Sequence, residues 1–211
     1  GRARVLAKKL DLALPSPIRH GTTFLWVDGL VDPEKLTDLS PKEVRLHSSR
    51  SVLGHMPYFL ATNHFCDDGM WFWVIPLHGK TSLGLVYDRE RVPRERVATA
   101  EKLVEWICEK FPLFARDLPQ RKILEWSGFK EFSHDCRQIL SADRWALSGE
   151  AGRFSDPLYS PGGDLISLQN TLIADAILSS ETPAGSEQLP SKVRLYDVMA
   201  RAFYDAYVPS Y

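Results

Sequence analysis

Three consecutive β-rich runs constrain the fold of this 211-residue chain more than any other feature. They span residues 58–65, 70–77 and 81–87, and each is rich in aromatic and β-branched side chains. Only short polar or glycine-containing breaks separate them, at residues 66–69 and 78–80. Breaks of this length favour hairpins. We therefore expect an antiparallel meander in the first half of the chain.

The other segments combine strand and helix signals. Residues 22–27 are predicted to form a strand, and Asp32-Pro33 to open a helical turn. Apolar residues recur at spacings of three or four in 97–111, which predicts an amphipathic helix. We expect an α+β fold. Further helices are predicted at 2–12, at 164–178 with an Asp164 cap and at 193–207. Short strands are predicted at 122–126 and 144–148, and a polar loop at 182–190.

Composition excludes several classes of function. The net charge is -1, from 26 basic and 27 acidic residues, which argues against nucleic acid as a main partner. No apolar run is long enough to span a membrane. The three cysteines are far apart and form no CxxC pair, so a reducing, cytoplasmic setting is the default expectation. His64, Cys66, Asp67 and Asp68 are read as a polar hairpin, and no metal site is predicted.

Residues 148–166, SGEAGRFSDPLYSPGGDLI, form the first segment with chemical meaning. The chain is expected to turn tightly at Gly149 and Gly152, to form a tight loop at Asp156-Pro157 and to enter a helix after Gly162-Gly163. Glycines at a helix start let a ligand approach the backbone, where free N–H groups and the helix dipole favour negative charge. The carboxylate of Glu150 can accept hydrogen bonds from sugar or ribityl hydroxyls. The pattern alone slightly favours an ordinary connection between a strand and a helix.

This segment resembles the second FAD-contacting motif of the flavin monooxygenase and halogenase superfamily, roughly GDAAGxxDPxxSxG. Gly152 and Arg153 replace the second Ala and second Gly of the motif, and Glu150 replaces its Asp. The residues that match as they stand are Gly149, Ala151, Asp156, Pro157, Ser160 and Gly162. The resemblance implies that FAD is bound by Gly149, Glu150, Gly152, Asp156, Pro157, Gly162 and Gly163.

The second segment is Trp71-Phe72-Trp73-Val74-Ile75-Pro76. Residues two apart on a strand share a face, so the two indoles are expected to form one apolar wall. Such a wall is most often core, and the pattern alone favours that interpretation. However, the run matches the WxWxIP motif typical of flavin-dependent halogenases. The resemblance implies that Trp71 and Trp73 line a substrate passage.

Together the two motifs make the chain similar to flavin-dependent halogenase-like oxidoreductases. The resemblance implies an FAD monooxygenase-like architecture, with an α/β FAD-binding domain remnant and a mostly antiparallel substrate-domain sheet. Residues 1–20 would end a first FAD-domain segment, and residues 21–140 would form the substrate-domain sheet and helix. Residues 141–180 would return to the FAD domain, and residues 181–211 would form a C-terminal helical segment.

The resemblance also implies an activity. The chain would belong to an enzyme that uses reduced FAD and oxygen on a small organic substrate, with a flavin reductase or another source of reduced flavin as partner. A hydroxylating monooxygenase or a prenyl reductase on the same fold is the alternative enzyme. A non-catalytic module that binds a partner or an apolar ligand is the alternative of another class. No catalytic residue is assigned, because no lysine stands in a recognisable copy of the family's catalytic motif.

Several positions depart from the family's pattern. GxGxxG, which holds the ADP part of FAD, is absent, so we expect a partial chain preceded by a segment that contains it. Halide contacts would fall on Ser160 and Gly162, but Pro161 between them has no N–H. Tyr159 stands where indole-specific members carry an acid. These departures count against halide binding and against tryptophan as substrate. The arginine run at 89–96 is read as a solvated turn before a helix.

Overall fold

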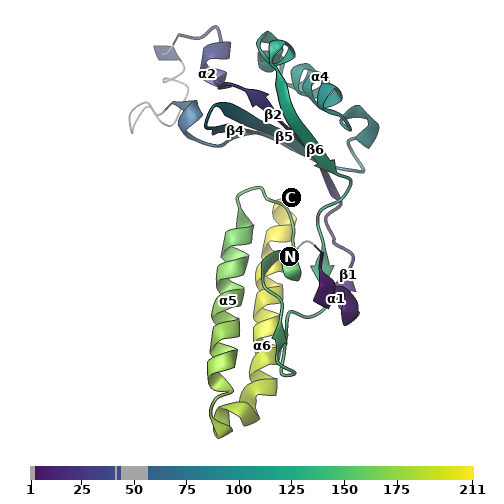
Figure 1. The fold of residues 1–211 in the computed structure, drawn as a ribbon, viewed down its shortest axis with the longest axis vertical. Helices are drawn as coiled ribbons and strands as arrows, with labels where there is room; N and C mark the ends of the chain where they lie inside the picture. Colours follow the sequence, from purple (N-terminus) through teal and green to yellow (C-terminus); the bar gives the residue numbers. More distant parts are fainter. Residues whose placement is uncertain (1–2, 41, 44–56) are drawn as a thin grey trace. The chain divides into compact units, whose positions relative to one another are not determined.

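The computed structural model describes residues 3–40, 42–43 and 57–211 (Figure 1). The chain forms two compact units. The first, called the sheet unit, is His20–Glu131, and the second, called the helical unit, combines Gly1–Arg19 with Phe132–Tyr211. Each unit has its own hydrophobic core. This mixture of helices with a mostly antiparallel sheet confirms the expected fold class.

The sheet unit is built on a five-stranded antiparallel sheet of order β3-β4-β5-β2-β6. The strands are β2 (His20–Asp28), β3 (Asn63–Asp67), β4 (Met70–Leu77), β5 (Lys80–Asp88) and β6 (Ile123–Phe129). The expected meander is confirmed by the pairing of β3 with β4 and of β4 with β5. The strand expected at 58–65 begins later, because Tyr58–Leu60 is a 3-10 helix and the Asn63 side chain donates to the carbonyls of Tyr58 and Ala61.

One face of the sheet is covered by α4 (Ala100–Lys110) (Figure 1). Leu103 and Ile107 of this helix pack on Phe72, Leu83 and Leu85 of the sheet. The helix begins three residues after the expected start because Thr99 is its N-cap and accepts from the Lys102 N–H at 3.4 Å. The unit also contains α2 (Pro33–Leu36), capped by Asp32 as expected, and 3-10 helices at Arg94–Arg96, Pro112–Arg116 and Leu118–Gln120.

The helical unit is dominated by α5 (Pro161–Ser179) and α6 (Pro183–Tyr207), which pack along each other (Figure 1). The polar loop expected at 182–190 is wrong, since these residues begin α6. Thr182 caps the helix by accepting from the Gly185 N–H at 3.1 Å, and Pro183 takes the first helical position. The smaller elements are α1 (Val5–Lys9), β1 (Ala13–Leu14) paired with β7 (Asp135–Cys136), β8 (Leu140–Ser141) paired with β9 (Trp145–Ala146), and 3-10 helices at Gly149–Ala151 and Val208–Ser210.

No helix within the described ranges is both long enough and apolar enough to cross a membrane.

Candidate functional site

The loop that precedes α5 is fixed at its start by Gly149. Its φ of +56° lies in the left-handed region, which glycine adopts without strain. A Cβ at this position would lie 2.7 Å from the side chain of Ile166, so space also requires glycine here. The Gly149 N–H donates to the buried Gln169 side chain at 2.6 Å. The loop is therefore tied to the helix that follows it.

The next residues of the motif differ in exposure. The Glu150 side chain points into solvent and has no hydrogen-bond partner among the described residues, whereas its carbonyl lies 2.9 Å from His134 Nε2. Gly152 is buried, and a Cβ there would meet Ile139, Cys136 and Leu147 at 3.1–3.3 Å. Glu150 is thus available to a ligand, while Gly152 permits close packing inside the loop.

A tight turn leads into α5. Asp156 is fully buried and its carboxylate accepts from the Leu158 N–H at 2.8 Å. The Ser160 N–H donates to the carbonyl of Pro157 at 2.9 Å. Tyr159 and Ser160 both have positive φ, at +62° and +56°, which is uncommon for residues with a side chain. The expected tight loop at Asp156-Pro157 is confirmed, and its backbone strain is of the kind that often accompanies a functional site.

The helix start is more open than the rest of the loop. We expected the helix to begin near Asp164, but it begins at Pro161, because the fixed φ of proline suits the first helical position. Gly162 and Gly163 therefore lie within the first turn. Their N–H groups have no hydrogen-bond partner in the described part of the chain, and a Cβ at either would meet nothing within 4 Å. Bare N–H groups at the positive end of a 19-residue helix favour an anionic ligand.

The three positions of the SxG element are not equivalent as donors. The Ser160 N–H is used in the turn with Pro157, and Pro161 has no N–H to donate. Gly162 is the first residue in this element whose N–H is free within the described residues. Of the two expected halide residues, only Gly162 retains an available backbone donor.

A buried ion cluster, which was not predicted from the sequence, anchors the loop. Arg153 has a fully buried side chain and donates to the Asp135 carboxylate at 2.9 Å. Arg201 of α6 donates to the other oxygen of Asp135 at 2.7 Å. Both arginines also donate to the carbonyl of Cys136 at 3.0 Å. The one sequence signal was the departure from the motif at Arg153, where the family has glycine.

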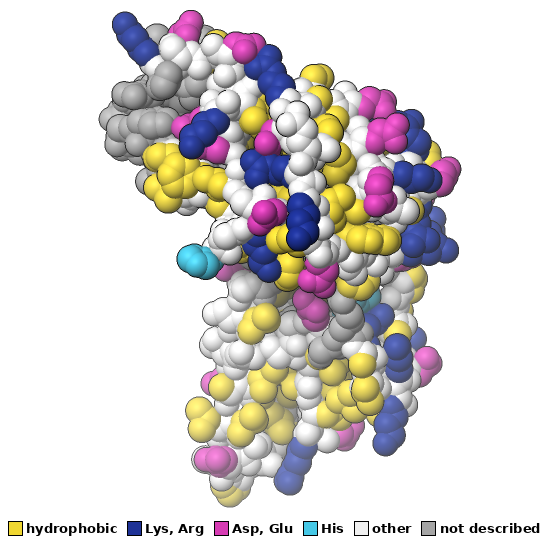
Figure 2. All heavy atoms as spheres, turned by 45° about the horizontal axis from the view of Figure 1, so that its top comes forward, with side chains coloured by type: hydrophobic (Ala, Val, Ile, Leu, Met, Phe, Trp, Pro, Cys, Tyr) yellow, Lys and Arg dark blue, Asp and Glu magenta, His cyan; other side chains and the backbone are white. Residues whose placement is uncertain are grey.

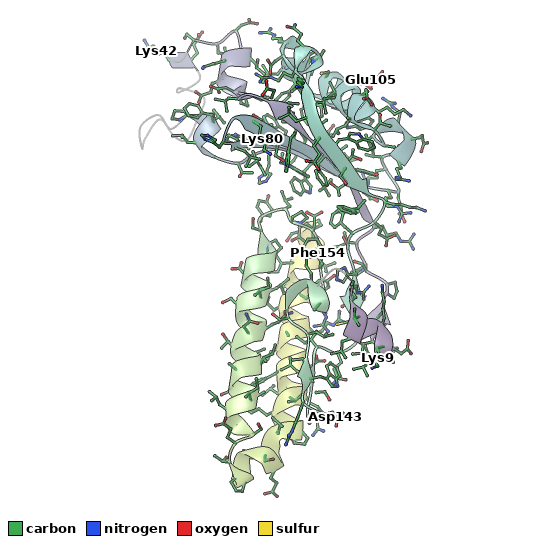
Figure 3. The ribbon with its side chains drawn as sticks, in the orientation of Figure 1. Lys9, Lys42, Lys80, Glu105, Asp143 and Phe154 are labelled. Carbon is green, nitrogen blue, oxygen red and sulfur yellow. The ribbon has the colours of Figure 1, made fainter. Side chains whose placement is uncertain are left out.

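The residues next to this cluster have structural roles. Phe154 exchanges backbone hydrogen bonds of 2.8 Å with His134 and closes the base of the loop (Figure 3). Burial raises the pKa of the Cys136 thiol to about 11, so it stays protonated at neutral pH. Cys136 is also fully buried, which fits a structural role for this side chain.

The aromatic run of β4 divides between the two faces of the sheet. Phe72 and Val74 enter the core under α4. Trp71 and Trp73 lie on the other face, with ring centroids 5.6 Å apart and ring planes at 46°. The expectation that the two indoles share a face is confirmed. Trp71 is itself buried, at 7% exposed, although neither indole is part of the cluster between sheet and helix.

The orientation of Trp73 is set by β5. Its cross-strand neighbour is Gly84, and a Cβ on Gly84 would lie 2.1–2.6 Å from three atoms of the indole. The Trp73 Nε1–H donates to the Ser82 hydroxyl at 3.1 Å. Gly84 and Ser82, together called the indole seat, therefore hold the ring flat across the sheet.

Other side chains on this face belong to β2 and β3. The ring centroids of Phe24 and Trp73 lie 6.2 Å apart. The His64 ring contacts the Trp71 ring edge-on, with ring centroids 5.3 Å apart. Burial lowers the pKa of the His64 imidazole. The ammonium of Lys80 lies 3.4 Å from the Trp26 ring centroid, at the turn between β4 and β5 (Figure 3). The face is an aromatic surface with a mainly neutral imidazole at its margin.

Curated relatives of the chain are halogenases. It is 22% identical over 143 residues to flavin-dependent halogenase chlA of Dictyostelium discoideum, and the aligned region covers 66% of this chain and 24% of the relative. It is 29% identical over 168 residues to the tetracycline 7-halogenase of Kitasatospora aureofaciens, which covers 74% of this chain and 28% of that enzyme. The chain therefore spans about a quarter of the length of these relatives. No protein-family model matches the chain.

Solved structures share the fold. The flavin-dependent halogenase CmlS superposes with a TM-score of 0.64 at 20% identity, over 96% of this chain and 33% of that chain. Halogenase PltM in complex with phloroglucinol and FAD superposes with a TM-score of 0.66 at 19% identity, over 88% of this chain and 38% of that chain. The fold of this chain is thus found within longer halogenase chains.

Proposed function

This chain is homologous to a part of flavin-dependent halogenases, and we therefore propose that it forms part of an FAD-dependent oxidoreductase. The observation that carries the proposal is the bare start of α5. There the free N–H groups of Gly162 and Gly163 stand at the positive end of a long helix, with open space in place of side chains. A reduced flavin carries negative charge near N1 and the C2 carbonyl, which such a helix start stabilises.

The residues of the loop fit one part of FAD. Gly162 and Gly163 would accept the ring system, and the exposed carboxylate of Glu150 would accept hydrogen bonds from ribityl hydroxyls. Gly149 and the turn at Asp156-Pro157 would hold the loop in shape, and Gly152 would let it pack closely. The 211 residues contain no GxGxxG, so the chain offers no such loop for the ADP part. When bound, FAD would supply the redox chemistry with oxygen.

The two units would have different tasks. We assign the sheet unit to the substrate, because Trp71 and Trp73 offer a rigid apolar wall to a small organic molecule. We assign the helical unit to the flavin, because it contains the loop and the start of α5. A flavin reductase, or another source of reduced flavin, would complete the system. The three free cysteines agree with a reducing, cytoplasmic setting.

A second enzymatic function is favoured by one observation. Only Gly162 keeps a free N–H in the SxG element, so a halide has fewer backbone donors here than the family pattern provides. A hydroxylating monooxygenase, or a prenyl reductase, uses the same flavin site without a halide. Chloride dependence of the product separates these functions.

The flavin site is tested first by Gly163→Val. A Cβ at this position meets nothing in the protein, so folding should be unaffected, while the branched side chain fills the space proposed for the ring. We expect flavin affinity to fall by roughly tenfold or more, which corresponds to about 1.4 kcal/mol. Affinity is measured from FAD fluorescence during titration with the protein.

Ser167→Val is the matched control, because Ser167 is exposed on α5 about one turn beyond Gly163. It should leave flavin affinity and the thermal midpoint unchanged. Equal affinity of the Gly163→Val variant and the unmodified protein would contradict the assignment of the helix start. If the unmodified protein binds no flavin, the non-catalytic module becomes the better function.

Halide binding is tested by Pro161→Ser. The substitution restores a backbone N–H at the first helical position, where a free donor points out of the helix. We expect bromide and chloride to stabilise the variant more than the unmodified protein, as a rise in thermal midpoint with halide concentration. Pro119→Ser, at an exposed position in the sheet unit and outside the loop, is the control and should show no such rise. An unchanged halide response in a protein that already halogenates would mean that other donors bind the ion.

A further inference from the structure

The arginine run between β5 and α4 contains one member that differs from the rest. Arg89 pairs with Glu131, Arg91 with Asp68, and Arg96 with Glu109 at 2.6 Å. Arg94 is exposed and forms no ion pair with any described carboxylate. Figure 2 shows basic and acidic side chains interspersed on the surface of the sheet unit, which fits the paired members of the run. The solvated turn expected here is seen at Arg94, which is exposed in the 3-10 helix Arg94–Arg96 and differs from the others in having no described counter-ion.

Arg94 lies at a hollow of about 300 Å³ that belongs entirely to the sheet unit. The hollow is formed at the pairing of β2 with the edge strand β6, where Thr23 faces Gly128. A Cβ on Gly128 would lie 2.8 Å from the Thr22 carbonyl and 3.3 Å from the Thr23 hydroxyl. A side chain at Gly128 would press on β2 itself, so glycine permits the close pairing of the two strands that form the floor of the hollow.

Polar groups surround this floor. Thr23 contributes its hydroxyl and Thr22 its backbone carbonyl, which are the polar atoms of β2 nearest to the missing side chain of Gly128. Behind Thr23, burial raises the pKa of Tyr87, and the neighbouring guanidinium of Arg94 and hydroxyl of Thr23 offset part of that rise. Arg94 thus lies beside Thr22 and Thr23 in the lining of the hollow, with its charge unneutralised by any described carboxylate.

One wall of the hollow is aromatic. Trp126 of β6 lines it and is 47% exposed, which is high for a large aromatic side chain. Tryptophan offers a rigid flat surface to a planar ligand and is enriched where proteins bind others. The hollow therefore combines a cation that has no carboxylate partner among the described residues, the Thr23 hydroxyl and one flat apolar surface.

We propose that this hollow is a binding site for a small aromatic monocarboxylate. The planar guanidinium of Arg94 matches the geometry of a carboxylate and can donate two parallel hydrogen bonds to it. A single cation balances a single charge, which favours a carboxylate over a doubly charged phosphate. The volume is at the lower end for small-molecule sites, so a one-ring ligand fits and a dinucleotide does not. The site lies apart from the flavin loop in the chain and does not depend on the proposed flavin function.

Benzoate is the probe that tests this site, titrated into the flavin-free protein and followed by calorimetry and by the indole N–H signals in ¹⁵N NMR. We expect saturable binding that shifts the Trp126 indole signal. Arg94→Gln should weaken benzoate binding by about tenfold or more, since the charge-assisted hydrogen bonds are lost. Trp126→Leu should weaken benzoate binding but leave the weaker binding of acetate unchanged.

Arg96→Gln is the matched control, because Arg96 belongs to the same run but is already paired with Glu109. It should bind benzoate as the unmodified protein does. Benzyl alcohol, which has the ring without the charge, should not compete. Equal benzoate affinity in Arg94→Gln, equal weakening by Arg96→Gln, or no saturable binding by the unmodified protein would each overturn the proposal.

Discussion

Replacing Asp135 with asparagine is expected to destabilise the helical unit by about 3–5 kcal/mol, because one partner of a buried ion pair is lost. Asp135 is 4% exposed and is the carboxylate shared by Arg153 and Arg201. The asparagine keeps the shape of the side chain but leaves the buried guanidinium of Arg153 without a counter-charge. The free energy of unfolding is measured in urea by far-UV circular dichroism, whose signal comes mostly from the long helices α5 and α6.

Asp205→Asn is the control for this experiment. Asp205 also pairs with Arg201, at 3.4 Å, but its side chain is 55% exposed. Exposed pairs contribute little, so the loss should be below about 1 kcal/mol. Similar losses for the two variants would show that the buried cluster does not anchor the loop before α5.

The second large effect is expected from Gly84→Ala in the sheet unit. The new methyl group would lie within 2.1–2.6 Å of the Trp73 indole, so the ring must leave the indole seat or the strands must separate. Inserting a methyl group into a close-packed contact costs about 1–3 kcal/mol. We expect that loss in urea unfolding, together with a changed near-UV circular dichroism spectrum, since the Trp71–Trp73 pair is reoriented.

A double substitution separates steric strain from general weakening of the strand. In a Trp73→Ala background, Gly84→Ala has no indole to meet and should cost much less. Ser82→Ala removes only the hydrogen bond to Trp73 Nε1 and should cost about 1 kcal/mol. If Gly84→Ala costs the same with and without Trp73, the seat does not fix the ring.

The sequence by itself determined the parts of this protein that depend on local periodicity and turn chemistry. The strand β4 was predicted at its observed bounds, since aromatic and β-branched residues fill it and short breaks flank it. The shared face of Trp71 and Trp73 follows from the two-residue period of a strand. The turn at Asp156-Pro157 followed from the properties of Asp and Pro.

Helix starts were harder to predict, because caps compete locally. Asp164 was expected to cap α5, but the helix begins three residues earlier, at Pro161. Polar composition suggested a loop after Thr182, but Thr182 is the N-cap of α6, which begins at Pro183. In both cases a proline at the first helical position determined the outcome. Composition alone does not distinguish a polar first turn from a polar loop.

Only the tertiary structure decided which distant residues meet. Asp135, Arg153 and Arg201 come from three separate segments, and their pairing depends on β7, the loop and α6 packing into one unit. Likewise, Arg94 differs from Arg96 only because a carboxylate lies within reach of one and not of the other in the described structure. Such contacts depend on the three-dimensional path of the chain, and a local pattern of residue types contains no information about which remote side chain will share a buried position.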